Sequence, residues 1–132
     1  MIQKIKEKCA NLKYDITIDK DFPTLLSQAA VLITEFSWTG FEGSLFDVPL
    51  IVTNLQGKSY SDYALLYHKE GIALYATTLI ELFDCLSRIL NDYQTQEKLK
   101  EARKKLNYDF NYLNDGRAAQ RIFKLLTAEN IK

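Results

Sequence analysis

Features that define several common classes of protein are scarce in this 132-residue chain. Basic and acidic residues balance at 17 each, so no basic field suggests nucleic acid or an anionic membrane surface as the main partner. No apolar run approaches the roughly 20 residues that span a bilayer. The N-terminal sequence MIQKIKEKCANLK lacks the apolar core of a secretory signal. We therefore expect a cytoplasmic protein without a membrane span.

Residues that commonly bind metals or carry catalysis are also few. The two cysteines, Cys9 and Cys85, lie far apart and form no CxxC pair, so in a reducing cytosol we expect buried thiols. The single histidine, His68, has no nucleophile partner in the surrounding sequence YHKEG, which argues against a Ser-His-Asp triad. A place at a helix C-terminus suits it better. No metal site and no cofactor are expected.

Alternating strand and helix patterns indicate the fold class. Strands are predicted over residues 14–18, 30–34, 49–54 and 72–76, and helices over 2–12, 21–29, 59–71, 78–93, 95–109 and 116–128. The strands over 30–34 and 49–54 are continuously apolar, as in parallel sheets that helices cover on both faces. We therefore predict an α/β fold: a single domain over 1–132, built as a three-layer, Rossmann-like α/β/α sandwich with a parallel sheet of about four strands, closed by C-terminal helices.

Local signals support several of these helices. Pro23 lies in a first helical turn behind Asp21, where its missing N–H costs nothing. Thr78 and Glu81 have the spacing of a capping box ahead of a strongly apolar stripe. The charge-rich helix over 95–109 is expected to present a solvated face.

Residues 34–49, TEFSWTGFEGSLFDVP, separate the two continuously apolar strands. Ligands of open α/β sheets bind beyond the carboxyl ends of the strands, and here a helix is expected to begin near Thr39 or Gly40. Free N–H groups at its first turn would face a bound anion. The stretch contains neither GK[ST] nor GxGxxG. It does offer hydroxyls at Ser37, Thr39 and Ser44, and glycines at 40 and 43 that leave room for a phosphate.

Two further side chains in this stretch have two readings each. Glu42 lies in the first turn of the expected helix, where it can bind paired ribose hydroxyls or only complement the helix dipole, which is worth about 0.3–1 kcal/mol. Trp38 can stack on a sugar or base, or it can be buried against the sheet.

The order Ser37, Thr39, Glu42, Asp47 and Pro49 between two buried strands resembles the nucleotide-sugar half of the GT-B glycosyltransferases. In that superfamily a Ser/Gly-rich turn, a Thr three residues before a Glu, and G-x-P lead into the next strand. Asp47 stands where glycine is usual. Since aspartate tolerates unusual backbone angles, we expect it to adopt the required turn.

The C-terminal sequence NDGRAAQRI, residues 114–122, resembles the DG-x-A-x-x-RI ending of CDP-glycerol glycerophosphotransferases and related surface-polymer enzymes. These enzymes also carry A-x-VLIT-x-x-S, which matches residues 29–37 apart from its spacing residues. A structural role is favoured for the ending itself: Asp115 caps a helix, and Arg121 binds a neighbouring carboxylate or loop.

The resemblance implies the donor-binding lobe of a transferase that builds a cell-surface polysaccharide, with a nucleotide-diphosphate sugar or a CDP-alcohol as donor. Glu42 would bind the ribose, the turn from Ser37 to Gly40 would hold the phosphates, and Asp62 and Tyr63 are further candidates for contacts to the base or sugar. The acceptor-binding lobe of such an enzyme is not recognisable in the sequence, so a partner chain could supply it. The alternative is a non-catalytic α/β interaction module with a vestigial nucleotide site.

Overall fold

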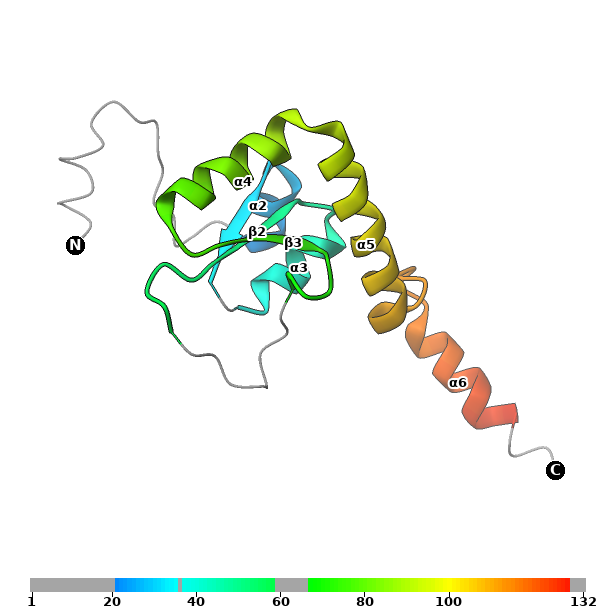
Figure 1. The fold of residues 1–132 in the computed structure, drawn as a ribbon. Helices are drawn as coiled ribbons and strands as arrows, with labels where there is room; N and C mark the ends of the chain where they lie inside the picture. The colour runs from blue at the N-terminus through cyan, green and yellow to red at the C-terminus, as the bar shows by residue number, and fades with distance from the viewer. Residues whose placement is uncertain (1–20, 36, 59–66, 129–132) are drawn as a thin grey trace.

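The computed structural model of the chain describes residues 21–35, 37–58 and 67–128 (Figure 1). The elements, in chain order, are α2 (Phe22–Ser27), β1 (Leu32–Thr34), α3 (Thr39–Leu45), β2 (Leu50–Thr53), β3 (Ala73–Ala76), α4 (Leu79–Asn91), α5 (Tyr93–Asn111) and α6 (Ala118–Ala128). The helix predicted over 2–12, the strand predicted over 14–18 and most of the helix predicted over 59–71 lie outside the described residues.

The described strands form one parallel sheet in the order β1-β2-β3. Leu32 of β1 pairs with Leu50 of β2, which in turn pairs with Ala73 of β3. Parallel neighbours need a crossover connection, and α3 supplies the one between β1 and β2. The predicted parallel sheet is confirmed for these three strands.

Helices cover the sheet on both faces. Alternate residues of β2 point to opposite sides, so they belong to two different clusters of buried side chains. One cluster of buried side chains contains Leu50, Val52, Tyr67, Ile72, Ala73 and Leu106, and the other contains Ile51, Ala76, Cys85, Ile89 and Leu99. α3 packs on the first face through Phe41, and α4 covers the second (Figure 1). The predicted three-layer α/β/α architecture is therefore confirmed, with α5 contributing to both clusters.

β1 is less buried than the sequence predicts. Leu50, Ile51 and Val52 of β2 are at most 1% exposed, whereas Ile33 of β1 is 44% exposed. The prediction that the strand over 30–34 is buried on both faces is wrong for Ile33. The reason is that α4 packs on β3 and β2, and β1 lies at the edge of the described sheet.

The predicted capping residues stand at the starts of two helices. The carboxylate of Asp21 accepts a hydrogen bond from the N–H of Thr24 at 3.2 Å, and Pro23 lies in the first turn of α2. Thr78 and Glu81 form the predicted capping box at the start of α4. The N–H of Glu81 donates to Thr78 Oγ1 at 3.2 Å, and the N–H of Thr78 donates to Glu81 Oε2 at 3.2 Å.

The boundary between α4 and α5 differs from the prediction. α4 ends at Asn91, and Tyr93, which the apolar stripe assigns to the same helix, is the first residue of α5. Asp92 between them is extended, and its carboxylate accepts a hydrogen bond from the N–H of Gln94 at 3.0 Å. One residue therefore ends α4 and caps α5, which extends to Asn111 rather than residue 109.

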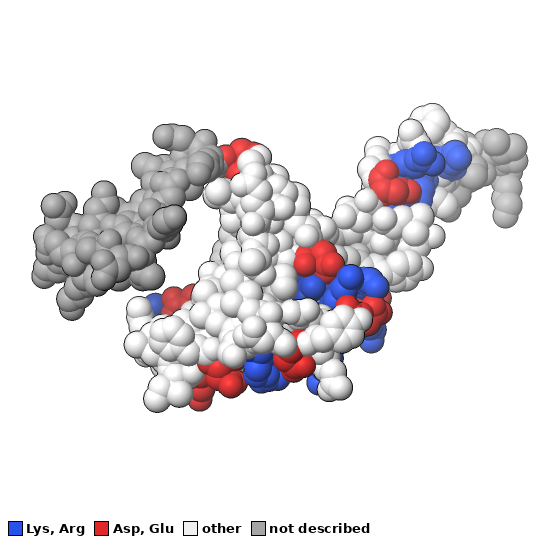
Figure 2. Space-filling view, turned by 90° about the horizontal axis from the view of Figure 1, so that it is seen from above, with Lys and Arg blue, Asp and Glu red and all other residues white. Residues whose placement is uncertain are grey.

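α6 projects from the body of the fold, as Figures 1 and 2 show. Four of its apolar side chains are more than half exposed: Ile122, Phe123, Leu125 and Leu126. The expectation that the C-terminal helices close the sandwich is therefore confirmed for α4 and α5 and wrong for α6. The predicted local contacts do form, since Asp115 accepts a hydrogen bond from the N–H of Arg117 at 3.0 Å and pairs with Arg121 at 2.8 Å.

Candidate functional site

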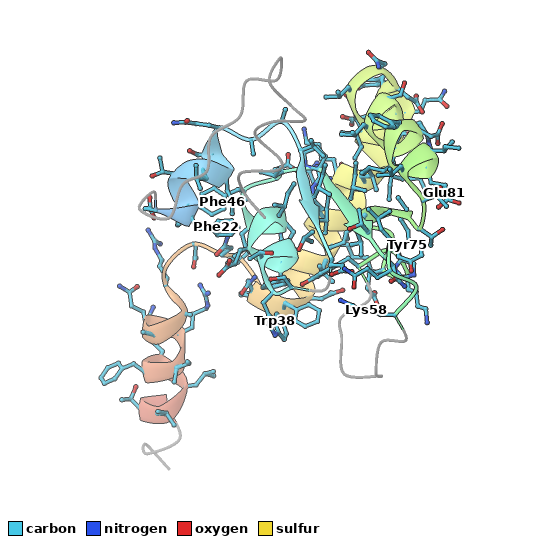
Figure 3. All side chains as sticks on the ribbon, turned by 90° about the vertical axis from the view of Figure 1, so that its left-hand side faces the viewer. Phe22, Trp38, Phe46, Lys58, Tyr75 and Glu81 are labelled. Atoms are coloured by element: carbon cyan, nitrogen blue, oxygen red, sulfur yellow. The ribbon has the colours of Figure 1, made fainter. Side chains whose placement is uncertain are left out.

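The loops that follow the three strands lie at one edge of the sheet. Because the strands are parallel, Thr34, Thr53 and Ala76 all end at this edge. Figure 3 looks toward it and shows Trp38, from the loop after β1, and Lys58, from the loop after β2, at the same end of the molecule. Open α/β sheets bind their ligands beyond the carboxyl ends of the strands, so the candidate site lies here.

Ser37 organises the turn between β1 and α3. Its Oγ accepts a hydrogen bond from the N–H of Thr39 at 3.2 Å, and its carbonyl accepts one from the N–H of Gly40 at 3.1 Å. The hydroxyl of Tyr67 donates to the same carbonyl at 2.7 Å. The prediction of free N–H groups at this helix start is therefore wrong for Thr39 and Gly40, whose N–H groups already have partners in the turn.

Both glycines of α3 are explained by packing. A Cβ atom on Gly40 would lie 2.6 Å from the ring of Tyr67, and one on Gly43 would lie 2.7 Å from the side chain of Leu32. Protein atoms fill the space beside each glycine, which corrects the expectation that it is left for a phosphate. The two glycines instead let α3 approach β1 and Tyr67 closely.

Tyr67 is a buried anchor for this turn, with only 3% of its surface exposed. Burial raises the pKa of its hydroxyl, and the negative charge of Glu42 acts in the same direction, while a hydrogen bond with the backbone of Phe41 opposes them. The hydroxyl therefore stays protonated at neutral pH and remains a donor to Ser37.

Glu42 lies in the first turn of α3, and its side chain is exposed. It makes no hydrogen bond or ion pair with any residue in the described part of the chain. The N-cap of α3 is Trp38, which provides no side-chain cap. A carboxylate that its own helix leaves unpaired can accept hydrogen bonds from a ligand, and a favourable interaction with the helix dipole accompanies that role.

Trp38 and Thr39 precede Glu42 by four and three residues in the sequence. Trp38 is 69% exposed, which excludes burial against the sheet, and its ring meets that of Phe41 edge-on with the centroids 6.3 Å apart. Thr39 is half-buried, and its Oγ1 lies 3.5 Å from the Oγ1 of Thr34 at the end of β1. The end of β1 and the start of α3 thus offer an exposed indole ring, two hydroxyls and a carboxylate, which can hold a polar ligand that has an aromatic ring.

Lys58 brings a positive charge to this edge, and the sequence reasoning missed it. It pairs with Glu35, the residue that follows β1, at 3.8 Å across the two neighbouring loops. Asn54 shapes the loop, since its side chain accepts from the N–H of Lys58 at 2.9 Å and donates to the carbonyl of Lys58 at 3.1 Å. The position of the loop NLQGKS at the end of a predicted strand was the signal that could have identified this lysine.

Asp62, Tyr63 and His68 are the remaining residues that the sequence analysis considered. Asp62 and Tyr63 lie outside the described residues. His68 is half-buried, and its ring stacks on that of Tyr75 with the centroids 4.4 Å apart. Burial lowers the pKa of His68, and the charge of Lys69 lowers it further. Packing against Tyr75 therefore accounts for the histidine.

Three features of the described ranges bear on other kinds of site. No group of three or more His, Cys, Asp or Glu residues in these ranges could hold a metal ion. Cys85 is a free, buried thiol, and burial raises its pKa. None of the helices that the structure describes is long and apolar enough to cross a membrane.

Comparison with known proteins identifies the family. No curated protein and no solved structure matches the chain. A family model described as CDP-glycerol:poly(glycerophosphate) glycerophosphotransferase matches residues 2–128, which is almost the whole sequence. The resemblance carried by the stretches around Glu42 and Asp115 is thus supported by a match that covers both. The chain belongs to the CDP-glycerol:poly(glycerophosphate) glycerophosphotransferase family.

Proposed function

We propose that this chain binds a nucleotide-diphosphate-linked donor, a CDP-alcohol or a nucleotide sugar, as the donor lobe of a transferase that builds a cell-surface polymer. The family description names CDP-glycerol, which supports a CDP-linked donor. The observation that carries the proposal is Glu42, an exposed carboxylate without a partner among the described residues, in the first turn of the helix that follows β1. A carboxylate at this edge of an α/β sheet suits the hydroxyls of a ribose.

Each neighbouring group has a role in this proposal. Glu42 accepts hydrogen bonds from the ribose, and the exposed ring of Trp38 stacks on the base or sugar. A phosphate oxygen takes the place of the Ser37 hydroxyl as acceptor of the Thr39 N–H, since that N–H is now bonded within the turn. Lys58, on the neighbouring loop, neutralises part of the diphosphate charge.

The chemistry of the proposed transfer makes these charges useful. An acceptor hydroxyl attacks the phosphorus that carries the glycerol, the bond between the two phosphates breaks, and CMP leaves with the electron pair. Negative charge grows on the leaving phosphate, where Lys58 and the hydroxyls of the Ser37 turn can stabilise it. We assign the acceptor site and the base to a second lobe, so the chain alone is expected to bind the donor without turnover.

Calorimetric titration of the purified chain with CDP, UDP and GDP tests the proposal. We expect one nucleotide to bind and Glu42→Ala to weaken binding about tenfold or more, because a hydrogen bond to a charged group is lost. The matched control is Asp84→Ala, which removes an exposed carboxylate from α4. A folded wild-type chain that binds none of the three nucleotides would overturn the proposal.

A protein-interaction module is the second candidate, and one observation favours it. α6 carries several large apolar side chains that are more than half exposed, as a helix that contacts a partner protein would. The two candidates are compatible in a split transferase whose partner chain supplies the second lobe. Nucleotide binding in the titration favours the donor lobe, and its absence from a folded chain favours the interaction module.

A further inference from the structure

α3, which carries Glu42, is a short helix of seven residues and depends on tertiary contacts for its position. Isolated helices of this length are unstable in water. Gly40 and Gly43 let it pack on Tyr67 and Leu32, but apolar contacts alone permit small rotations and shifts of a helix. The polar contacts at its C-terminal end therefore decide how it is oriented.

Arg103 of α5 holds Asp47, which lies two residues beyond the end of α3. It is a buried side chain, 3% exposed, and its Nε and Nη2 donate to Asp47 Oδ1 at 3.0 and 2.7 Å. Nη2 also lies 3.3 Å from the carbonyl oxygen of Asp47. The planar guanidinium thus fixes both the side chain and the backbone of Asp47, in a geometry that a lysine cannot reproduce.

Asn107, one turn further along α5, holds the last turn of α3 itself. Asn107 Nδ2 donates to the carbonyl of Ser44 at 2.8 Å. The single proton of the Ser44 hydroxyl is shared between Asn107 Oδ1 at 2.9 Å and the carbonyl of Phe41 at 2.7 Å. Ser44 is 2% exposed, so these hydrogen bonds are shielded from water. We call Arg103 and Asn107 the α5 clamp. They are four residues apart and lie on the same side of the helix.

The α5 clamp carries a cost in folding stability that an apolar contact at the same place would not have. Arg103 Nη1 is buried and has no hydrogen-bond partner among the described residues, and an unpaired buried donor carries a desolvation penalty. Buried ion pairs of this kind often stabilise a fold no better than apolar side chains of similar volume. The clamp instead fixes the orientation of α3, because its hydrogen bonds set the rotation and the register of α3 against α5.

We propose that the α5 clamp is a set of positioning residues for the donor site, acting through α3 on Glu42. This inference rests on the proposed nucleotide-binding function. Glu42 lies two residues before Ser44, so a shift of the clamped end moves its carboxylate as well. Binding groups need to be held within about 0.5 Å of the productive geometry. Loss of the clamp should therefore weaken recognition of the ribose while the fold is kept.

The test compares the affinity of the full chain for CDP with that for 2′,3′-dideoxycytidine 5′-diphosphate, which lacks the ribose hydroxyls. The wild type should prefer CDP about tenfold or more. Arg103→Lys and Asn107→Ala should each reduce this preference to about threefold or less, whereas Lys98→Ala, an exposed change on α5, should keep it. A purely structural role would lower stability but leave the ratio of the two affinities unchanged.

Combination with Glu42→Gln completes the test. If the clamp acts through Glu42, Arg103→Lys should not change the preference further in that background, because contacting networks are not additive. Should Arg103→Lys unfold the chain, Asn107→Ala, which leaves no buried charge unpaired, decides the outcome. A wild type that binds CDP with the ribose preference, together with folded clamp variants that keep it, overturns the clamp alone. A wild type that binds neither nucleotide overturns both the proposed function and the clamp.

Discussion

At the scale of single residues, Asp47 shows how a backbone requirement and a side-chain contact are met together. Its φ of 56° is a left-handed conformation that glycine adopts at no steric cost, and the resemblance places glycine here. The tolerance of aspartate for this conformation was predictable from the sequence. Arg103, its partner from α5, was not, because a charged residue in a lysine-rich helix is expected to be solvated.

Replacing Asp47 by glycine tests whether the backbone strain at this position or the ion pair with Arg103 has the larger effect on stability. Glycine relieves about 1 kcal/mol of backbone strain, but it removes the carboxylate that pairs with the buried Arg103, whose hydrogen bonds to a charged partner are worth about 1.5–3 kcal/mol. We expect Asp47→Gly to lower the free energy of unfolding by about 0.5–2 kcal/mol in urea denaturation. Asp47→Asn tolerates the same φ and keeps one acceptor, so its free energy of unfolding should lie between those of the wild type and Asp47→Gly. A glycine variant as stable as the wild type would mean that the ion pair contributes no more than the roughly 1 kcal/mol of backbone strain that glycine relieves.

At the scale of elements, starts of helices were predictable wherever the signal is local. Thr78 and Glu81 are three residues apart, and their capping box follows from the sequence because both partners belong to the same turn. The end of α4 was not predictable from its apolar stripe, which continues to Tyr93, since the extended backbone of Asp92 interrupts the helix. The turn at Ser37 was predicted, but the residue that holds it was not, because Tyr67 is 30 residues away.

The capping box of α4 predicts a pH dependence of stability. Hydrogen bonds from the backbone and side chain of Thr77 hold the pKa of Glu81 below its usual value of 4.5. A carboxylate whose folded pKa is depressed adds stability that is complete above the unfolded pKa and is lost as pH falls through the folded pKa. Glu81→Gln, which is neutral throughout, should therefore differ most from the wild type at neutral pH.

Urea denaturation between about pH 7 and about pH 3 measures this difference. The gap in unfolding free energy between the wild type and Glu81→Gln should shrink as the pH falls below 4.5. Asp84→Asn is the control, because Asp84 lies on the same helix but takes no part in its capping. A gap for Glu81→Gln that stays constant down to the acid limit would contradict the capping role of the charge.

At the scale of the whole molecule, the layers follow from the sequence, whereas the placement of the last helix does not. Strands as apolar as β2 have to be covered on both faces, and α3 and α4 do so. The periodic apolar residues of α6 predict a helix equally well. That pattern does not identify what the helix contacts. Its apolar side chains are exposed, on a helix that projects from the body (Figure 1).

Because α6 projects from the body with its apolar side chains exposed, we predict that it adds little to the stability of the body. The contacts of Arg121 are to Asp115 and to the ring of Tyr112, whose centroid is 5.1 Å away, and both partners lie next to the helix in the sequence. Deletion of residues 117–132 should change the free energy of unfolding by no more than about 0.5 kcal/mol. Leu106→Ala, which truncates a side chain that is 6% exposed in the core, should cost about 2–5 kcal/mol. If the deletion destabilises the chain as much as Leu106→Ala does, α6 must pack against the body in solution, and its apolar side chains would then not be free to contact a partner.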